Sequence, residues 1–252
     1  MNYDIFIPVR LGSKRFPNKS IQTILSKPII INLVERLSQC QNINKIIVCT
    51  TTNSFDDILV DLLKDNQIEY FRGDEKDILS RFLNAAKSFK TDFIINVDGD
   101  DIYTTTYSID ILIKKHEISK PNYLYFKNLP LGLTPVGFDV KSLEMICNLK
   151  KTNDTETGYR NFFTKNPKIK SLTLDGSKFV KFPKNLRLTL DYQDDYNLAL
   201  KVFSHLGNDF QWDDLMNLFE KYPELVELVS HLEKKWKNYW NKNLADYSLK
   251  NN

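Results

Sequence analysis

The sequence predicts an α/β protein built around one mostly parallel β-sheet. Through the first half of the chain, short runs rich in β-branched and aromatic residues alternate with segments that carry helical apolar spacing. This strand–helix–strand order implies parallel strands joined by right-handed crossover connections. Such sheets bind ligands beyond the carboxyl ends of their strands, so the residues directly after each strand are the candidates for function.

Each expected element of the first half is a run with one periodicity, bounded by polar or turn residues. The strands are expected at 3–9, 45–51, 68–73 and 92–101. The helices between them are expected at 28–40, 55–66 and 76–89. Residues 28–40 illustrate the basis, because apolar side chains recur there at the spacing of one helical face: Ile30, Leu33, Val34 and Leu37.

The second half of the chain is less regular. Residues 122–140 suggest strands around a turn-rich loop that contains two prolines. Further helices are expected at 142–149, 154–166 and 194–206, and further strands at 170–174 and 186–192. Residues 210–240 suggest two short helices broken at Pro223, and residues 241–252 suggest a frayed tail.

Length, charge and cysteine content exclude several classes of protein. The chain has 252 residues, enough for one large α/β domain. Its net charge of +3 is too small for an extended nucleic-acid surface, so any basic site must be local. No apolar run approaches the roughly 18 to 20 residues that cross a bilayer. Three cysteines without metal-ligand spacing, and no signal peptide, favour a reduced cytoplasmic protein.

A basic loop follows the first expected strand. Residues 7–20, "IPVRLGSKRFPNKS", contain a glycine and two prolines and lack a helical apolar stripe. Four cations lie within ten residues: Arg10, Lys14, Arg15 and Lys19. A tight turn that exposes backbone N–H groups beside four cations suits a triphosphate better than a single carboxylate. The segment is neither a Walker loop nor G-x-G-x-x-G, and a solvated basic loop is the alternative.

An acidic cluster ends the fourth expected strand. Asp98, Asp100 and Asp101 follow an apolar run, and three close carboxylates repel unless a cation lies between them. Strand alternation would point Asp98 and Asp100 to one side and Asp101 to the other. Carboxylates together with phosphate oxygens are the usual ligands of Mg²⁺, so a magnesium site is expected at this strand end.

Five segments together resemble one enzyme family. Residues 7–21 resemble the signature I-P-A-R-x-G-S-K-R-x-P-x-K-N-I of the CMP-sugar synthetases. These comprise the acylneuraminate and 3-deoxy-manno-octulosonate cytidylyltransferases and the F-type spore-coat polysaccharide synthesis proteins. Four more segments match in the order of the family: "VCTTTNSFDD" at 48–57, "YFRGDEKDILSRF" at 70–82, "NVDGDD" at 96–101 and "LTLDYQDDYNLAL" at 188–200. The resemblance implies a Rossmann-like sheet of the nucleotide-diphospho-sugar transferase (GT-A-like) type.

The resemblance also implies a nucleotide site. Cations of the basic loop, with the backbone N–H groups of Gly12 and Ser13, would bind the phosphates and stabilise the leaving pyrophosphate. Arg72 matches an arginine that lies near the nucleotide in the family. The nucleotide-binding residues implied in this way are Pro8, Arg10, Gly12, Ser13, Lys14, Lys19, Arg72, Ser80 and Asp98.

Asp100 and Asp191 correspond to the metal-binding aspartates of the family. Asp100 matches the acid of "Q-G-D-E-P" and Asp191 that of "D-T-P-E-D", and the resemblance implies Mg²⁺ as their cofactor. Helix capping is the alternative for the acids at 191–195, and we favour it for Asp194 and Asp195. The implied catalytic residues are Arg10, Lys19, Asp100 and Asp191.

The acceptor side of the site matches the family less closely. Four residues correspond to acceptor-side segments or could engage an acceptor carboxylate: Gly137, Glu156, Tyr159 and Arg160. We expect a catalytic domain at 1–210, with residues 105–170 serving acceptor binding and homodimerisation, and a helical extension at 211–252. Within that extension, an apolar stripe suggests core packing or a subunit contact: Trp212, Leu215, Phe219, Leu225, Leu228 and Val229.

The implied activity is transfer of CMP from CTP to a small sugar-acid-like acceptor in surface polysaccharide biosynthesis, with no nucleic-acid or membrane partner. Two alternatives stay open. A metal-dependent glycosyltransferase with a nucleotide-sugar donor could use the acid-x-acid motif at Asp98 and Asp100. A non-catalytic relative could bind nucleotide only. The basic loop favours the first activity, because it suits a free triphosphate and is not needed for a diphospho-sugar donor.

Overall fold

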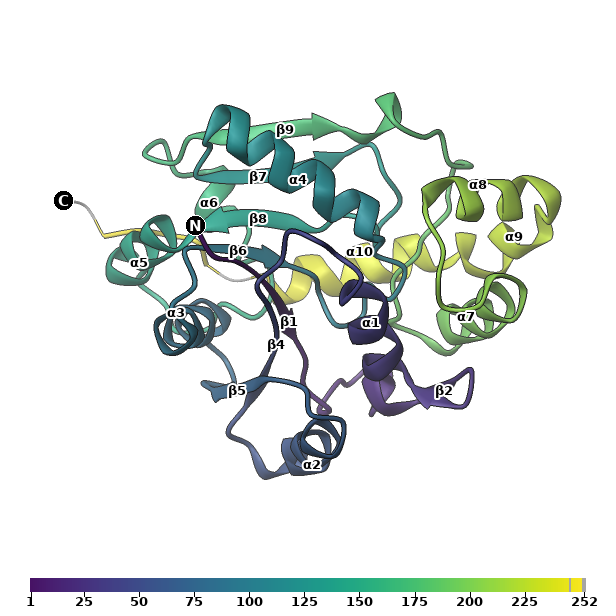
Figure 1. Ribbon diagram of the computed structural model, residues 1–252, viewed down its shortest axis with the longest axis horizontal. Coiled ribbons are helices and arrows are strands. Elements are labelled where there is room, and N and C mark those ends of the chain that lie inside the picture. Colours follow the sequence, from purple (N-terminus) through teal and green to yellow (C-terminus); the bar gives the residue numbers. More distant parts are fainter. Residues whose placement is uncertain (245, 251–252) are drawn as a thin grey trace.

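One seven-stranded sheet organises the molecule. The computed structural model describes residues 1–244 and 246–250. The strands are β1 (Tyr3–Pro8), β4 (Lys45–Thr51), β5 (Tyr70–Gly73), β6 (Phe93–Asn96), β7 (Tyr123–Lys127), β8 (Val136–Asp139) and β9 (Ser171–Asp175). Their order across the sheet is β5-β4-β1-β6-β8-β7-β9, and β8 is the one strand of the described sheet that runs antiparallel (Figure 1). The mostly parallel α/β fold is therefore confirmed.

Helices cover both faces of the sheet. They are α1 (Ile29–Leu37), α2 (Asp57–Asp65), α3 (Ile78–Phe89), α4 (Thr106–Ser119), α5 (Val140–Leu149), α6 (Asn161–Thr164), α7 (Gln193–Leu206), α8 (Trp212–Lys221), α9 (Glu224–Ser230) and α10 (Leu232–Asn243). Short 3-10 turns, η1 (Lys19–Ile21), η2 (Ser54–Asp56) and η3 (Gly176–Lys178), and a hairpin of β2 (Thr23–Ile24) and β3 (Lys27–Pro28) complete the described elements.

The two faces of β1 belong to two separate cores. Successive side chains of a strand point to opposite faces, so Ile5 and Ile7 pack with α1 and α4, whereas Phe6 packs with α3 and α5. All three side chains are fully buried, as expected for a central strand of a parallel sheet. With β4 on one side and β6 on the other, β1 is an interior strand whose side chains contribute to the cores on both faces of the sheet.

Several expected elements differ from the structure. The expected strand at 186–192 forms one isolated bridge, Leu131 with Arg187, because its backbone pairs with loops and not with the sheet. The expected helix at 154–166 shrinks to α6, since Gly158 adopts a φ of +84° just before it. The fourth strand ends at Asn96, and a turn from Asp98 to Asp101 follows it.

The C-terminal helices pack into the main core. The chain breaks at Pro223 as expected, but a third helix, α10, follows α9. The apolar stripe of α8 and α9 is buried or partly buried in the same core as α1 and α4, so the expectation of core packing is confirmed. The domain boundary at residue 210 stays a prediction.

Residues near the C-terminus are attached to the body of the protein. Lys250 donates a backbone hydrogen bond to Leu149 at 2.7 Å and Lys151 donates one to Ser248 at 3.2 Å. The expectation of a frayed tail is thus wrong for 241–243, which belong to α10, and for 246–250, while residues 245 and 251–252 lie outside the described residues. None of the helices in the described ranges is long and apolar enough to span a membrane.

Candidate active site

A cavity of about 670 Å³ lies beyond the carboxyl ends of β1 and β6. These neighbouring strands pair in parallel, so the loops that follow them leave the sheet at the same edge. The predicted site residues that line the cavity are Pro8, Arg10, Gly12, Ser13, Lys14, Lys19, Asp98, Asp100, Glu156, Tyr159, Arg160 and Asp191. Most of the residues predicted from separate parts of the sequence therefore meet in one place.

The basic loop is held by hydrogen bonds of its own backbone. The amide of Leu11 donates to the Asp56 carboxylate at 2.8 Å, and the buried Leu11 side chain anchors the turn. The Leu11 carbonyl then accepts from the amides of Ser13 at 2.9 Å and Asn18 at 3.2 Å. Asn18 has a φ of +57°, which turns the chain so that Lys19 begins η1 at the cavity wall. The backbone of the basic loop is thus fixed by hydrogen bonds to defined partners.

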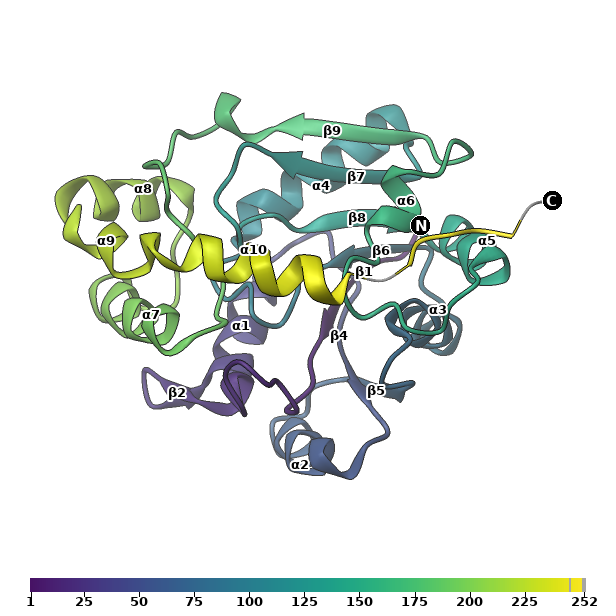
Figure 2. The ribbon, with the colours of Figure 1, turned by 180° about the vertical axis from the view of Figure 1, so that it is seen from behind.

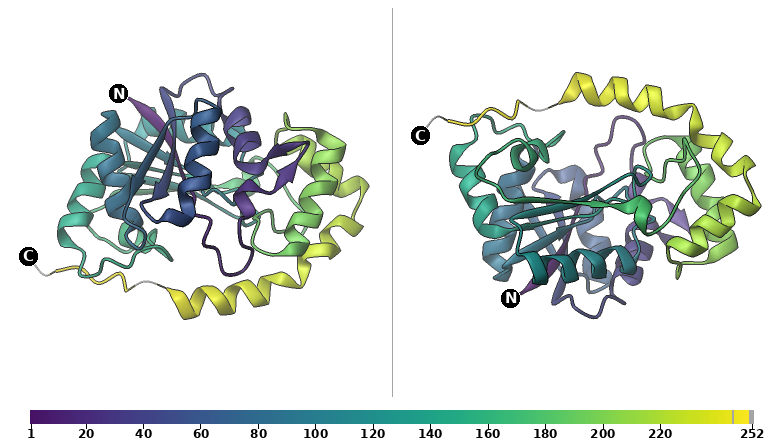
Figure 3. Two further views of the ribbon diagram at one scale, coloured as in Figure 1. Left: turned by 90° about the horizontal axis from the view of Figure 1, so that it is seen from below. Right: turned by 90° about the horizontal axis from the view of Figure 1, so that it is seen from above.

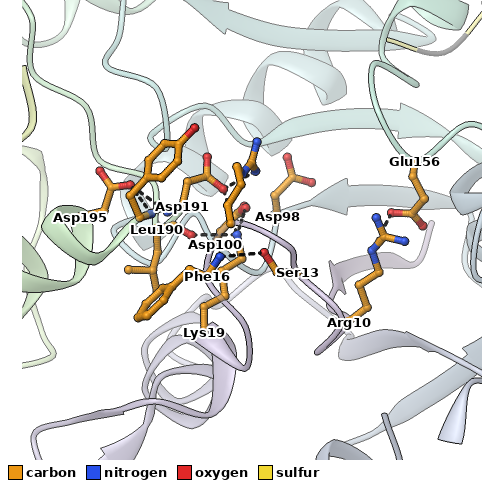
Figure 4. A network of polar contacts seen from close by, with 12 residues as sticks. Arg10, Ser13, Phe16, Lys19, Asp98, Asp100, Glu156, Leu190, Asp191 and Asp195 are labelled. Atoms are coloured by element: carbon orange, nitrogen blue, oxygen red, sulfur yellow. Dashed lines mark hydrogen bonds and ion pairs between the residues drawn. The ribbon is translucent and has the colours of Figure 1, made fainter. Parts of the chain in front are cut away.

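Lys19 joins the basic loop to both acidic segments (Figure 4). Its Nζ donates to Asp100 Oδ2 at 2.6 Å, to the Leu190 carbonyl at 2.8 Å and to Asp191 Oδ1 at 3.1 Å. Burial alone would lower the pKa of Lys19, but attraction to Asp100 and Asp191 raises it overall. Lys19 is therefore a firmly charged cation placed between two carboxylates that are 91 positions apart in the sequence.

Asp191 is surrounded by cations. Arg15 and Lys19 contact its Oδ1 atom, and Arg187 contacts its Oδ2 atom at 3.3 Å. Burial would raise the pKa of Asp191, but Lys19, Arg15 and Arg187 together lower it. Asp191 is 1% exposed, so these contacts stabilise a carboxylate that would otherwise be costly to bury.

Asp195 fixes the backbone that carries Asp191. Its Oδ2 atom accepts from the amides of Asp191 and Tyr192, both at 2.9 Å, and it also pairs with Arg187. The predicted capping role of Asp195 at the start of α7 is confirmed. Asp194 instead lies at the surface and pairs with His231 at 3.3 Å, so its predicted capping role is wrong.

All three acids after β6 line the cavity. The expected opposite orientation of Asp101 is wrong, because a turn and not a strand carries residues 98–101. Burial raises the pKa of Asp100, as do Asp191 and Asp98, although Lys19 opposes them. Burial, Asp98 and Asp100 raise the pKa of Asp101 well above its usual range. For Asp100 and Asp101, the nearby positive charge is therefore too small to offset burial and the neighbouring carboxylates.

A divalent cation would need further ligands, such as phosphate oxygens, besides the carboxylates of this part of the cavity. Within the described ranges, no group of three or more His, Cys, Asp or Glu side chains is arranged to hold a metal ion. Two carboxylates, Asp100 and Asp191, do face the same atom, Lys19 Nζ, at 2.6 and 3.1 Å. Mg²⁺ is often bound by one or two carboxylates with phosphate oxygens and water, so this pair fits the metal of a nucleotide complex.

A second polar cluster lies at the other side of the cavity (Figure 4). Glu156 pairs with the buried Arg81 at 2.7 Å and, more loosely, with Arg10 at 3.8 Å. Nearby, Arg160 pairs with Asp98 at 2.8 Å, and the buried Tyr159 hydroxyl accepts from Asn96 at 2.7 Å. The turn before α6 thus brings its predicted acceptor-side residues to the cavity.

Three predicted site residues lie outside the cavity. Arg72 donates to the carbonyls of Thr51 at 2.8 Å and Asn53 at 3.0 Å, which ties β5 to the end of β4. An ion pair with Asp57 at 2.7 Å adds to these contacts and holds the Arg72 side chain beside β4 and α2, whereas Glu75 and Lys76, which follow β5, line the cavity. Arg72 was expected to bind nucleotide, and its observed contacts are structural.

Ser80 and Gly137 are also placed away from the cavity. The Ser80 hydroxyl donates to Asp77 at 2.7 Å in the first turn of α3, so it serves the helix start. Gly137 lies within β8, where an added Cβ would come within 2.6 Å of Leu124 and 2.7 Å of Phe93. Close strand packing explains this glycine, and neither residue reaches the cavity in which ligand binding was expected.

Sequence reasoning missed one wall of the cavity. Four residues of α10 line it: Trp236, Tyr239, Trp240 and Asn243. The Arg15 guanidinium lies over the Tyr239 ring, 4.3 Å from its centroid. The available signal was an aromatic spacing of one helical face within a strongly charged segment, but that segment otherwise has the composition of a solvated helix.

Comparisons with known proteins agree with this geometry. Residues 5–221 match the family described as Cytidylyltransferase. An uncharacterized protein, MJ1063, of Methanocaldococcus jannaschii is 29% identical over 91% of this chain and 95% of its own. The spore coat polysaccharide biosynthesis protein SpsF of Bacillus subtilis is 25% identical over 89% of this chain and 97% of its own.

Solved structures share the fold. A cytidylyltransferase from Leptospira borgpetersenii superposes with a TM-score of 0.80 at 24% identity, covering 90% of this chain and 97% of its own. A CMP:2-keto-3-deoxy-manno-octonic acid synthetase complexed with CTP gives 0.62 at 12% identity, covering 82% and 100%. Rv0371c of Mycobacterium tuberculosis, complexed with manganese, gives 0.54 at 10%, covering 79% and 97%. Because the family match spans most of the chain and the cavity gathers most of the residues predicted from the signature, the chain belongs to the cytidylyltransferase family.

Proposed function

We propose that the protein transfers CMP from CTP to a small sugar-acid-like acceptor and releases pyrophosphate. The observation that carries this proposal is the position of Lys19, which brings the basic loop into contact with both Asp100 and Asp191 inside one cavity. Phosphoryl chemistry needs cations at the phosphates and carboxylates for a metal, and this arrangement supplies both within one hydrogen-bonded network.

The basic loop is the proposed phosphate site. Arg10, Lys14 and Lys19 line the cavity together with Gly12 and Ser13, whose backbone N–H groups are further donors. The Arg10 side chain is 40% exposed and only loosely paired with Glu156, so little is lost when it turns towards a phosphate. In the reaction, an acceptor oxygen would bond to the α-phosphorus as the bond to pyrophosphate breaks, and these cations would stabilise the leaving group.

Asp100 and Asp191 are the proposed ligands of Mg²⁺. When bound, the metal would offset charge on the α-phosphate and activate the attacking oxygen. Lys19 Nζ lies between the two carboxylates, and a phosphate offers it an alternative partner of the same charge. The manganese complex of Rv0371c supports a divalent ion on this fold, while the preference for magnesium belongs to the proposal.

Glycosyl transfer from a nucleotide-sugar is less well supported. That reaction would use Asp98 and Asp100 as an acid-x-acid metal motif, but the two carboxylates have different partners. Asp98 pairs with Arg160 at 2.8 Å and Asp100 with Lys19 at 2.6 Å. Family membership and the cationic loop both favour a free triphosphate as the substrate.

The testing experiment is pyrophosphate release by the purified protein with MgCl₂. CTP, UTP, GTP and ATP are each combined with a panel of nonulosonic acids, octulosonic acids and phosphorylated polyols. Release with CTP and one acceptor is expected, and Asp100→Asn serves as the inactive control. Absence of pyrophosphate release with every nucleotide–acceptor pair, together with consumption of a nucleotide-sugar donor, would favour glycosyl transfer instead.

The wider setting of the enzyme is part of the proposal. The spore coat polysaccharide relative supports a role in surface polysaccharide biosynthesis. A homodimer formed through residues 105–170 and a cytoplasmic location stay predictions. Sedimentation equilibrium tests the dimer directly, since a monomer at every concentration would contradict it.

A further inference from the structure

The helix α10 presents one aromatic face to the cavity. Trp236, Tyr239, Trp240 and Asn243 lie at i, i+3, i+4 and i+7, which places them in one row, and all four line the cavity. The other α10 positions are mostly lysines, asparagines and a glutamate, and within α10 only Leu232 is buried. Trp236, Tyr239 and Trp240 are each partly buried, and Trp236 also packs against the main core.

The helix is fixed at both ends, so it forms a wall. Leu232 is buried in the main core at its start, and Leu244 lies against Gly158 just past its end. Beyond that point the chain pairs with residues 149–151 at the end of α5. In Figures 2 and 3 α10 (yellow) runs from α9 towards the C-terminal segment beside α5 as the outermost layer on that side of the molecule.

The aromatic row adjoins the catalytic acids. Arg15 contacts Asp191 and lies 4.3 Å from the centre of the Tyr239 ring, so it connects the acid to α10. Trp236 and Trp240 lie one turn apart, with ring centroids 6.1 Å apart and planes 25° apart. Two indoles therefore line the same cavity as Asp100 and Asp191, and Tyr239 between them in the row contacts Arg15.

We propose that the aromatic row of α10 is a binding surface for the ring of the acceptor, with Trp236 and Trp240 as its stacking platform. This inference rests on the proposed function. Indoles offer a broad apolar surface and one N–H donor, which suits the C–H face and hydroxyl rim of a sugar ring. They offer no charge to a triphosphate. Asn243, at the end of the row, and Arg15, over the Tyr239 ring, line the same cavity and are the polar side chains nearest the row for the polar groups of such a ring.

Kinetics of Trp236→Ala and Trp240→Ala test the inference. The acceptor is the one that supports pyrophosphate release by the wild-type protein. We expect the acceptor KM to rise about tenfold in each variant, the scale of one lost stacking contact, while the CTP KM stays within about twofold. Trp240→Phe should recover most of the acceptor affinity. Phe55→Ala, an equally drastic aromatic truncation at a side chain 74% exposed on η2, is the matched control.

Fluorescence gives a readout independent of turnover. The chain has three tryptophans, and the third, Trp212, is buried in the core at 2% exposure. Addition of the acceptor to the CTP-bound protein is expected to change the emission of the wild type. The Trp236→Phe, Trp240→Phe double variant should lose that change, because only Trp212 remains.

Two results would overturn the inference. A higher CTP KM with an unchanged acceptor KM would mean that the indoles stack on the base, and unchanged values of both would mean that α10 is only structural. Either result leaves the proposed function intact, because the wild-type protein still releases pyrophosphate. Failure of the wild type with every acceptor contradicts the proposed function itself, and this inference with it.

Discussion

Lys19 is the residue at which the basic and acidic parts of the cavity meet. Its Nζ atom contacts two carboxylates and one carbonyl, and its side chain is 13% exposed. Replacing Lys19 with methionine keeps most of the length of the side chain but removes the charge. We expect the CTP KM to rise at least about tenfold, since one charge-assisted contact to phosphate is lost. Lys27→Met, at an exposed lysine outside the cavity, is the control, and an unchanged CTP KM in Lys19→Met would contradict the phosphate role.

Asp100 and Asp191 differ in burial, so their variants should differ in stability. Both Asp100→Asn and Asp191→Asn are expected to lower kcat by about 100-fold or more, because a bound metal stabilises transition-state charge by several kcal/mol. Asp191 meets three cations with a side chain 2% exposed, so its loss should cost about 3 kcal/mol of unfolding free energy. Asp100 is 25% exposed, and its loss should cost about 1 kcal/mol or less. Urea unfolding measures the difference, and equal stabilities would count against this view of Asp191.

The three cysteines should be slow to react in the folded protein. Burial raises the pKa of Cys40, Cys49 and Cys147 to about 12 in each case. The thiolate is the reactive species, so at pH 8 almost none is present. Titration with a disulfide reagent at pH 8 is expected to show little fast reaction in the native protein and three thiols after denaturation. Rapid modification of the native protein would show that these sites open readily.

At the scale of elements, the segment that carries Asp191 depends on one glycine. The Leu188 amide donates to the Leu131 carbonyl at 2.7 Å, and the Leu190 amide donates to the Asp100 carbonyl at 2.8 Å. Gly132, with a φ of +97°, lies directly against the Leu188 carbonyl, so any Cβ there would overlap it. The extended segment 186–191 is therefore placed by loop contacts and not by the sheet.

Gly132→Ala should destabilise the protein and disturb Asp191 at the same time. Positive φ and steric overlap together are expected to cost at least about 2 kcal/mol. Gly12→Ala is the matched control for stability, because an added Cβ there meets nothing within 4 Å. Thermal unfolding of both variants gives the comparison. A stability of Gly132→Ala equal to that of Gly12→Ala would show that this loop contact is unimportant.

Local patterns in the sequence predicted most helices and strands of the first half of the chain. The site residues that were misplaced or missed depend on contacts between segments that are distant in the sequence. Runs rich in β-branched and aromatic residues identified β1 and β4, because this composition belongs to each strand itself. Arg72 was expected in the site because it matches an arginine near the nucleotide in the family, but the sequence does not show that its side chain is held at the end of β4. The row on α10 was missed for a related reason. Its aromatic residues face a cavity whose other walls lie more than 40 residues away in the chain.

At the scale of the whole molecule, one cavity unites the basic loop, the acidic turn, the segment at Asp191 and α10. Lys19 links the first three by direct hydrogen bonds, and Arg15 links Asp191 to α10. A substrate that enters would therefore contact elements from both ends of the chain. A bound ligand should then stabilise the whole fold against unfolding, because its binding site exists only when all of these segments are in place.

The central claim is that the bond to the α-phosphorus of CTP is exchanged for a bond to an acceptor. Incubation of the protein with MgCl₂, CTP labelled at its α-phosphorus and the acceptor panel tests it most directly. We expect the label to move into a CMP–acceptor product with an equal amount of pyrophosphate, and both to vanish with EDTA or with Asp100→Asn. Label that stays in CTP with every acceptor, or that ends only in free CMP, would contradict the account.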